Sequence, residues 1–354
     1  MPKRPVPFIL CGAVALVGVC AITFAGLDAA RPSVGVELQP LPYPMIGVAA
    51  GGPRDQYRYV WAPGALESTR MYATDALVLR VVRKRPDKRA IYEIATRLGI
   101  AVTPEEYAGM PEVQKGTGFD SSAYMRSFEQ MNVEDQRLFD CKDVDVWDNG
   151  CFSYWHRGGT PSPGSPNGPW AVDALSPERT REIAERFIAD SGLLPEGCEF
   201  ERVRTAVTQN AQGIEIYSAD QAPPRVVSRQ VVYTRRVEGI PLDSFSIDVN
   251  GNGEVYRVTR RIPNFAPWVR YPMLSPDEAR RMLPQGLLPS HIWGPATAVI
   301  DHVSLSYTRE WNLSNLIQPV YTFSGTAHCQ GGLTDTFSVT WPAVRPEYLM
   351  PPER

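Results

Sequence analysis

The sequence predicts an α+β fold in which antiparallel sheets are each backed by a helix, as repeated helix-plus-meander units that follow an N-terminal transmembrane helix. Three observations predict it: an uncharged stretch at residues 8–26, a three-stranded meander at residues 226–262, and two helices that open with Leu-Ser-Pro. A hydrophobic fraction of 43% is ordinary for a globular core. The net charge of −3 argues against a nucleic-acid partner, which usually binds to a basic domain.

The N-terminal sequence predicts a membrane anchor. Residues 8–26 follow two basic residues and, at about 1.5 Å rise per residue, form a helix long enough to span the bilayer core. Positive charge before such a stretch favours a cytoplasmic N-terminus, so we expect a single-pass cell-membrane protein whose bulk is extracytoplasmic. Three alternatives stay open: a signal peptide cleaved near Ala25 or Ala30, a lipoprotein modified at Cys20, and a buried core helix.

Composition divides the chain into five parts. Residues 1–26 are the signal anchor or signal peptide, and residues 27–63 are rich in Pro, Gly and Ala, which is typical of a stalk. Residues 64–170 form a first α+β subdomain that ends in a loop rich in Pro, Gly and Ser. Residues 171–345 form the second α+β part, and residues 346–354 form a C-terminal tail.

The first subdomain is expected to contain a strand, a helix and a hairpin. Residues 76–82 (ALVLRVV) are typical of a strand. Residues 88–98 carry apolar side chains at helical spacing, and Gly99 marks the end of that helix. Residues 143–155 contain alternating apolar residues and an Asp-Asn-Gly turn, which predicts an antiparallel hairpin.

The second subdomain begins with the clearest helix, at residues 175–194. Ser176 is expected to be its N-cap and Pro177 its first residue. Residues 274–283 repeat the Leu-Ser-Pro opening, which indicates that a helix-plus-strand unit is used more than once. The meander and three further strands complete this part, the latter at residues 303–308, 318–325 and 334–344.

The second turn of the meander offers a candidate metal site. Asp248, Asn250 and Asn252 precede Gly253 in the pattern of the first half of a calcium-binding EF-hand loop. Thr259 stands where the bidentate acid of such a loop belongs, and predicted strands rather than helices flank it. Because Asn and Gly are also the residues that a tight hairpin turn requires, a plain turn is the competing interpretation.

Four of the six cysteines lie beyond the predicted anchor, an even number that is compatible with disulfides in an extracytoplasmic domain. Cys141 and Cys151 flank the predicted hairpin, whose antiparallel strands would bring them near each other, so we expect a bridge between them. Cys198 and Cys329 are then the remaining pair. Four free, buried thiols are the alternative.

Aromatic residues gather around the hairpin and the loop that follows it. Trp147, Tyr154, Trp155 and Trp170 fit a recognition groove for an extended peptide or a glycan. The same residues also fit a small core that clamps the hairpin, so the sequence leaves both interpretations open.

The chain contains no recognised catalytic motif. Its four histidines lack the spacing of a metal site, and there is no nucleophile elbow and no phosphate-binding glycine loop. Asp143, Asp145 and Asp148 would suit acid–base chemistry, but they also fit the outward positions of a half-exposed strand. We therefore expect no enzymatic activity and no cofactor.

The helix led by Ser-Pro, followed by a meander whose second turn reads VNGNGEVYRV, resembles PepSY-like and YycH/YycI-type extracytoplasmic domains of membrane-anchored bacterial proteins. The closing strands QPVYTFSG and FSVTWPAV are similar to the last strands of bacterial lipoproteins with that architecture, so the resemblance covers residues 174–344. It implies a membrane-tethered module that contacts proteases or sensor kinases and has no chemistry of its own.

These observations predict a non-enzymatic regulatory protein that binds another membrane or envelope protein, such as a sensor kinase or a protease. Two alternatives from other classes stay open. The first is a cell-envelope hydrolase that uses scattered acids or histidines. The second is a structural protein that binds wall polymer through the aromatic residues between positions 147 and 170.

Overall fold

In the residues that the computed structural model describes, strands predominate and form three sheets, of seven, four and three strands. The structure describes residues 38–44, 57–65, 74–84, 87–100, 104–109, 124–130, 142–156, 173–209, 225–283, 296–308, 315–329, 332 and 334–350. The expected α+β fold of repeated, helix-backed sheets is therefore wrong, because the chain is mostly β. Within the described ranges no helix is long and apolar enough to cross a membrane. The predicted anchor lies outside those ranges and stays a prediction.

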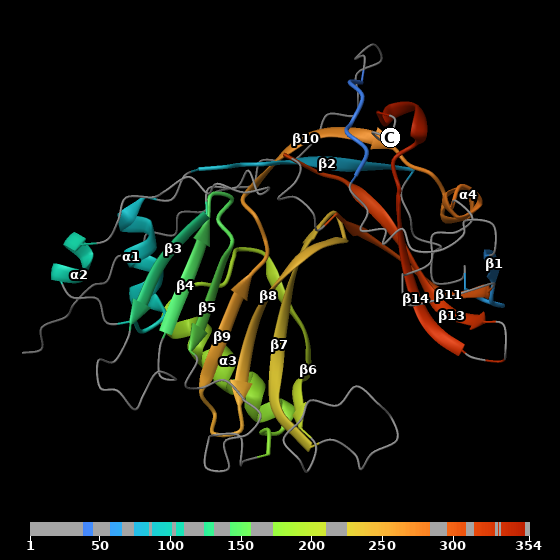
Figure 1. Ribbon diagram of the computed structural model, residues 1–354. Helices are drawn as coiled ribbons and strands as arrows, with labels where there is room; N and C mark the ends of the chain where they lie inside the picture. The colour runs from blue at the N-terminus through green and yellow to red at the C-terminus, as the bar shows by residue number, and fades with distance from the viewer. Residues whose placement is uncertain are drawn as a thin grey trace, which may run out of the picture.

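The seven-stranded sheet joins the two predicted subdomains (Figure 1). The predicted hairpin is confirmed as β4 (Lys142–Trp147) and β5 (Phe152–His156). The predicted meander is confirmed as β7 (Arg225–Val237), β8 (Ile240–Asn250) and β9 (Val255–Arg260). Because β5 pairs with β9, opposing Tyr154 to Val258, the two form one antiparallel sheet, and the boundary expected near residue 170 does not separate them. In spatial order the strands are β3 (Tyr124–Gln130), β4 (Lys142–Trp147), β5 (Phe152–His156), β9 (Val255–Arg260), β8 (Ile240–Asn250), β7 (Arg225–Val237) and β6 (Cys198–Gln209).

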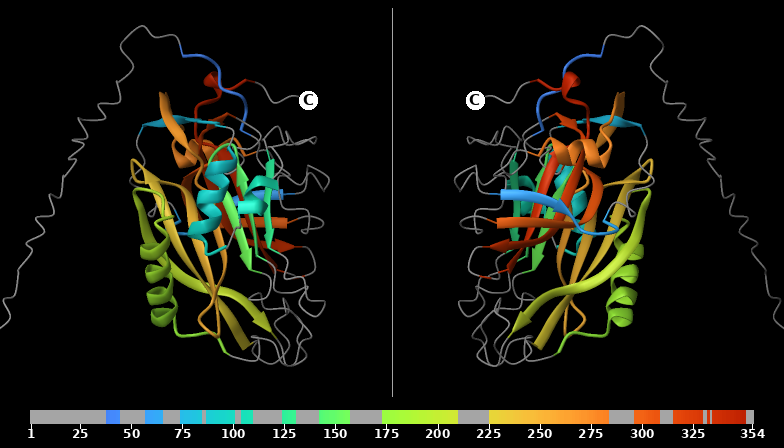
Figure 2. Two further views of the ribbon diagram at one scale, coloured as in Figure 1. Left: turned by 90° about the vertical axis from the view of Figure 1, so that its left-hand side faces the viewer. Right: turned by 90° about the vertical axis from the view of Figure 1, so that its right-hand side faces the viewer.

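One face of this sheet is apolar and carries the larger core. Alternate residues of its strands, such as Val231 and Phe245, point to that face, as the period of two requires. The helix α3 (Pro177–Ser191) lies along the same face (Figure 2). The helix α1 (Lys88–Arg97) packs Ile91 into this core, and α2 (Pro104–Gly109) contacts α1 through a pair of tyrosine rings.

The ends of α3 follow from its sequence, and its predicted N-cap is confirmed. The Ser176 hydroxyl accepts a hydrogen bond from the backbone N–H of Arg179, and Pro177 occupies the first turn, where no N–H partner is needed. Gly192 ends the helix with φ 62°, a left-handed conformation that glycine adopts at little cost. The helix is thereby fixed at both ends against the sheet.

The four-stranded sheet carries a second core and does not copy the meander. Its order is β1-β11-β13-β14, and β1 runs parallel to β11. The second Leu-Ser-Pro helix is confirmed as α4 (Pro276–Arg281), whose capping box joins Ser275 and Glu278. The helix α4 is short, and the strand that follows it, β11, pairs with β1 and β13 instead of forming a second meander. The expected repeat is therefore absent here. The strands are β1 (Tyr57–Trp61), β11 (Ala296–Tyr307), β13 (Pro319–Cys329) and β14 (Thr334–Pro342).

A three-stranded sheet connects the two larger ones across one end of the molecule (Figure 1). It consists of β10 (Phe265–Pro272), β2 (Asp75–Val81) and β12 (Leu316–Ile317). Its strands come from three distant parts of the chain, so it ties the fold together. The Tyr307 hydroxyl of β11 donates a hydrogen bond of 2.8 Å to the Leu77 carbonyl of β2, which anchors the four-stranded sheet to this connection.

Part of the expected stalk and of the expected tail is packed into the fold. Leu41 is fully buried, and its backbone exchanges hydrogen bonds of 2.7 Å with Tyr348 and Met350. The Tyr271 hydroxyl donates to the Gln39 carbonyl at 2.8 Å. The C-terminal 3-10 helix η4 (Pro346–Tyr348) lies at this junction. These segments therefore belong to the packed domain rather than to a spacer.

Candidate functional site

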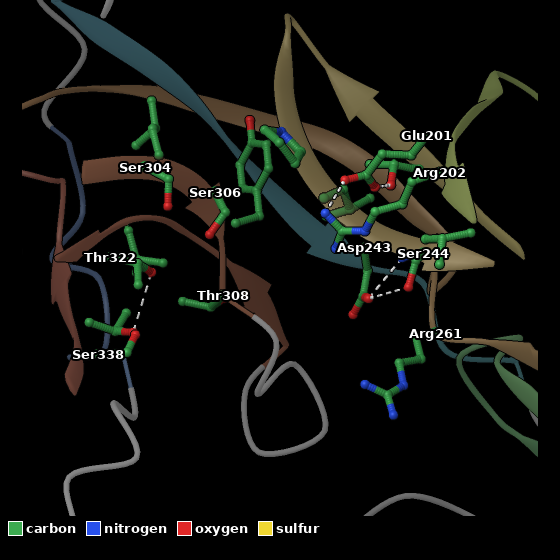
Figure 3. A pocket seen from close by; sticks show the side chains of 18 of the residues that line it. Glu201, Arg202, Asp243, Ser244, Arg261, Ser304, Ser306, Thr308, Thr322 and Ser338 are labelled. Carbon is green, nitrogen blue, oxygen red and sulfur yellow. Dashed lines mark hydrogen bonds and ion pairs between the residues drawn. The ribbon is translucent and has the colours of Figure 1, made fainter. Parts of the chain in front are cut away.

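A cleft of about 740 Å³ lies between the seven-stranded and the four-stranded sheets. Its walls come from β6, β7 and β8 on one side and from β11, β13 and β14 on the other (Figure 3). Neither wall was identified as a site from the sequence. The cleft collects polar side chains from six strands and is the candidate functional site of this protein.

One wall consists mainly of hydroxyl groups. Along β11 the side chain of Val303 enters the second core, whereas Ser304 and Ser306 line the cleft, because neighbouring residues of a strand point to opposite faces. The strand register places Ser304 beside Thr322, and Thr322 beside Thr340. The two threonine hydroxyls are 3.5 Å apart. Such a row offers uncharged hydrogen-bond donors and acceptors to a ligand.

The opposite wall is the outer face of the seven-stranded sheet, turned away from α3, and it carries charge. Glu201 accepts a hydrogen bond from the Thr234 hydroxyl and forms an ion pair of 3.2 Å with Arg202. Asp243 accepts from the backbone N–H of Ser244 at 2.8 Å. Figure 3 shows Arg202, Asp243, Ser244 and Arg261 along this wall, across from the hydroxyl groups.

A row of polar side chains runs from this wall across five strands. The register places Arg204, Gln230, Asp248, Arg257 and Trp155 side by side on β6, β7, β8, β9 and β5. Arg204 donates through Nε to the Gln230 amide oxygen at 2.8 Å, and the Gln230 amide nitrogen donates to Asp248 at 2.5 Å. Arg257 lies 4.0 Å from the Asp248 carboxylate and 4.6 Å from the centre of the Trp155 ring.

Asp248 has the most unusual environment in this row. Only 3% of it is exposed, and burial raises the pKa of its carboxyl group to about 6 because the charged form loses its water. The hydrogen bond from Gln230 and the positive charges of Arg257, Arg204 and Arg261 lower the same pKa. One carboxylate is therefore within electrostatic reach of three guanidinium groups.

The residues of the candidate calcium loop serve different purposes. Asp248 points into the charged row, whereas the Asn250 side-chain oxygen accepts hydrogen bonds of 3.0 Å from the backbone N–H groups of Asn252 and Glu254. That pattern is a hairpin turn closed by an asparagine. In the described ranges no group of three or more His, Cys, Asp or Glu residues could hold a metal ion.

The structure divides the aromatic residues expected to form a groove. Tyr154 is buried in the larger core, which corrects its expected binding role, because it faces the helices. Trp155 is its neighbour and so lies on the opposite face, stacked on Arg257. Trp147 is half-buried beside the hairpin turn, and Trp170 lies outside the described residues. Trp155 therefore shares a face of the sheet with the cleft, and the period of two places Trp147, at the end of β4, on that same face.

The cysteines and acids of the hairpin occupy separate places. Cys151 lies at the turn and is a free thiol, as are Cys198 and Cys329, so the latter two do not form the expected remaining pair. The start of β4 pairs with the end of β5, at the far end of the hairpin from Cys151. Cys141 lies outside the described residues, and because Cys151 is a free thiol the expected bridge to it is not formed. The Asp148 carboxylate forms an ion pair of 2.8 Å with Arg83, which joins the hairpin turn to the segment that follows β2.

Comparisons with known proteins give no family. No protein-family model matches the chain, and no curated protein resembles it in sequence. Among solved structures, an uncharacterised protein from Eubacterium rectale ATCC 33656 aligns over 85% of this chain and 90% of its own, with a TM-score of 0.42 and 10% identity. A likeness of that size carries no argument about function, so the function must be argued from the cleft.

Proposed function

We propose that this protein is a non-enzymatic binding module of the cell envelope, and that its cleft receives an extended segment of another envelope protein. The cleft itself is the observation that carries the proposal. Its volume of about 740 Å³ lies within the range of about 300–1,000 Å³ that is usual for ligand sites.

The chemistry of the walls favours a polar, extended ligand. Ser304, Thr322 and Thr340 form a cross-strand row of hydroxyls that can both donate to and accept from a peptide backbone. Neighbouring strands lie about 4.8 Å apart, so the row offers hydrogen bonds at regular intervals. A segment in an extended conformation leaves its backbone N–H and C=O groups open to such hydroxyls, whereas a helix uses most of them internally.

Binding is favoured over hydrolysis by the arrangement of the titratable groups. His302 lies in the cleft with Ser244 and Asp243, yet within the described residues His302 makes no hydrogen bond to either of them. Ser244 instead donates to Asp243 through its backbone N–H and its hydroxyl. A nucleophile activated by a base needs the two within hydrogen-bond reach.

The proposal is tested by closing the cleft. In the full-length chain, Ser304→Trp places an indole between the walls without adding charge, and Thr322→Trp does so from the neighbouring strand. The measurement is the amount of partner protein that is captured from intact membranes after chemical cross-linking. Both variants are expected to capture at least about ninety per cent less of it than the wild type, because a filled cleft excludes the segment. Arg97→Trp, on the exposed last turn of α1, is the matched control and should retain it. Equal capture by all four proteins would contradict the proposal.

A further inference from the structure

We infer that the segment bound in the cleft is acidic, and that Arg204 and Arg261 bind its carboxylate groups. This inference rests on the proposed function, since it names the chemistry of the ligand for the same cleft. It follows from three features of the charged wall: a net positive charge, a fixed orientation of Arg204, and an Arg261 guanidinium that has no partner among the described residues.

The excess of positive charge is local. Arg204, Arg257 and Arg261 all act electrostatically on the buried carboxylate of Asp248. Glu201 and Asp243 line the cleft, so three arginines (Arg202, Arg204 and Arg261) stand against two acids there, a net charge of +1. Glu201 is occupied by Thr234 and Arg202, and Asp243 accepts from Ser244. The wall is therefore complementary to an anion.

The orientation of Arg204 is set by buried neighbours. The Asp248 carboxylate, which is 3% exposed, accepts a hydrogen bond from the Gln230 amide nitrogen. The Gln230 amide oxygen therefore faces Arg204 and accepts a hydrogen bond from its Nε. The terminal amino groups of Arg204 make no hydrogen bond within the described residues, and the side chain lines the cleft. A guanidinium held by its Nε presents a planar pair of donors, which is the geometry that a carboxylate accepts in a bidentate manner. Gln230 and Asp248 are thus positioning residues.

Arg261 supplies the second positive group. Its backbone N–H donates to the Ser244 carbonyl at 3.0 Å, which fixes the main chain at the edge of the cleft. In the part of the chain that the structure describes, its guanidinium makes no hydrogen bond or ion pair, and Figure 3 shows it beside Asp243 on the charged wall. An exposed arginine at the rim of a cleft that already holds Arg204 favours a ligand with more than one negative charge.

The hydroxyl wall completes this assignment. Serine and threonine hydroxyls bind polar groups but do not neutralise charge, so the ligand's anionic groups must face the arginines across from them. An extended segment places alternate side chains on opposite sides. Acidic residues at every second position would then face Arg204 and Arg261, while small polar residues between them would face Ser304 and Ser306.

The test compares peptides that differ only in charge. The probes are fluorescein-labelled decapeptides of alternating Glu and Ser, and of alternating Gln and Ser, with binding to the purified full-length chain in detergent followed by fluorescence anisotropy. We expect the Glu peptide to bind about tenfold or more tightly than the Gln peptide, and raising NaCl from about 50 mM to about 500 mM to weaken it. Arg204→Gln and Arg261→Gln are each expected to weaken the Glu peptide about tenfold, and Arg204→Lys less than Arg204→Gln. Arg97→Gln, outside the cleft, should leave the affinity unchanged.

The outcomes separate this inference from the function on which it rests. If both peptides bind equally and Ser304→Trp abolishes both, the cleft binds protein segments but the acidic preference is overturned. If neither peptide binds while the wild type still captures a partner that Ser304→Trp loses, the acidic preference is overturned as well. If polygalacturonate binds with the same dependence on Arg204 and Arg261 and the Glu peptide does not, the ligand is an acidic polysaccharide and both proposals fall.

Discussion

At the scale of single residues, Asp248 shows how a short pattern in the sequence can mislead. Its spacing from Asn250 and Asn252 suits a calcium loop, yet its side chain belongs to a row that crosses the strands. The direction in which a strand residue points depends on the register and on what covers each face. The sequence around Asp248 predicts the turn. It does not predict that Asp248 contacts Gln230 and Arg257, because these residues lie on other strands.

The raised pKa of Asp248 makes stability depend on pH. Its value of about 6 in the folded state lies above the value of about 3.9 in an unfolded chain, so the native state holds this proton more tightly. The stabilising contribution of this group is therefore complete below about pH 4 and is lost as the pH rises through about 6. A shift of about two pKa units corresponds to about 3 kcal/mol.

Asp248→Asn is expected to raise the free energy of unfolding by about 3 kcal/mol at about pH 8, since it removes a buried charge and keeps an acceptor for Gln230. At about pH 4 the difference should nearly vanish. Urea unfolding followed by tryptophan fluorescence at both pH values measures it. Asp190→Asn, at an exposed position of α3, is the control and should show no such dependence. A wild type that gains stability over Asp248→Asn as the pH rises would contradict the sign.

At the scale of elements, local sequence patterns were sufficient to predict caps, hairpins and meanders. They did not predict which distant strands pair with each other. The caps of α3, the hairpin at β4–β5 and the meander at β7–β9 all depend on residues close in sequence, and all are confirmed. The pairings β5–β9 and β2–β10 join segments about 100 and 190 residues apart, and no periodicity within one strand specifies them. The repeat hypothesis is wrong for this reason: the meander strands that follow α3 and the strand β11 that follows α4 lie in separate sheets with different pairings.

Phe152→Ala tests whether the hairpin and the meander form one cooperative unit. The Phe152 ring is 1% exposed, and its centre lies 6.3 Å from that of Phe245 on β8. Removing it leaves a cavity between the hairpin and the meander, so we expect the free energy of unfolding to fall by about 3–5 kcal/mol in a single transition. Val82→Ala, at a residue 43% exposed, should cost less than about 1 kcal/mol. Two separate transitions, or a small loss for Phe152→Ala, would show that the sheet is divided.

At the scale of the whole molecule, the cleft arises because two sheets with separate cores face each other through their polar sides. The apolar sides are packed with α3 on one sheet and with α4 on the other. The connection through β2 and β10 holds the sheets together at one end. Polar wall meets polar wall, so the space between them suits a polar ligand better than further core packing.

The cleft could have been partly anticipated from the sequence. In residues 303–308 (VSLSYT) and 334–340 (TDTFSVT), serine or threonine alternates with apolar residues, which predicts strands with one hydroxyl face. What the pattern lacks is the opposing wall. Arg261 lies 42 positions before residue 303 and Arg204 lies 99 positions before it, and the assembled sheets bring them into one cleft. Composition predicted the type of face, and tertiary pairing determined what it faces.

Photo-crosslinking from inside the cleft tests the central claim most directly. Replacing Ser306, which lines the hydroxyl wall, with p-benzoylphenylalanine places a reactive group where the partner segment is expected, and the same replacement at Arg97 on α1 places it outside. In intact membranes we predict a covalent adduct with one envelope protein from position 306 and none from position 97, and we predict that the additional change Ser304→Trp removes that adduct. The same adducts from both positions, or none from position 306, would contradict the account.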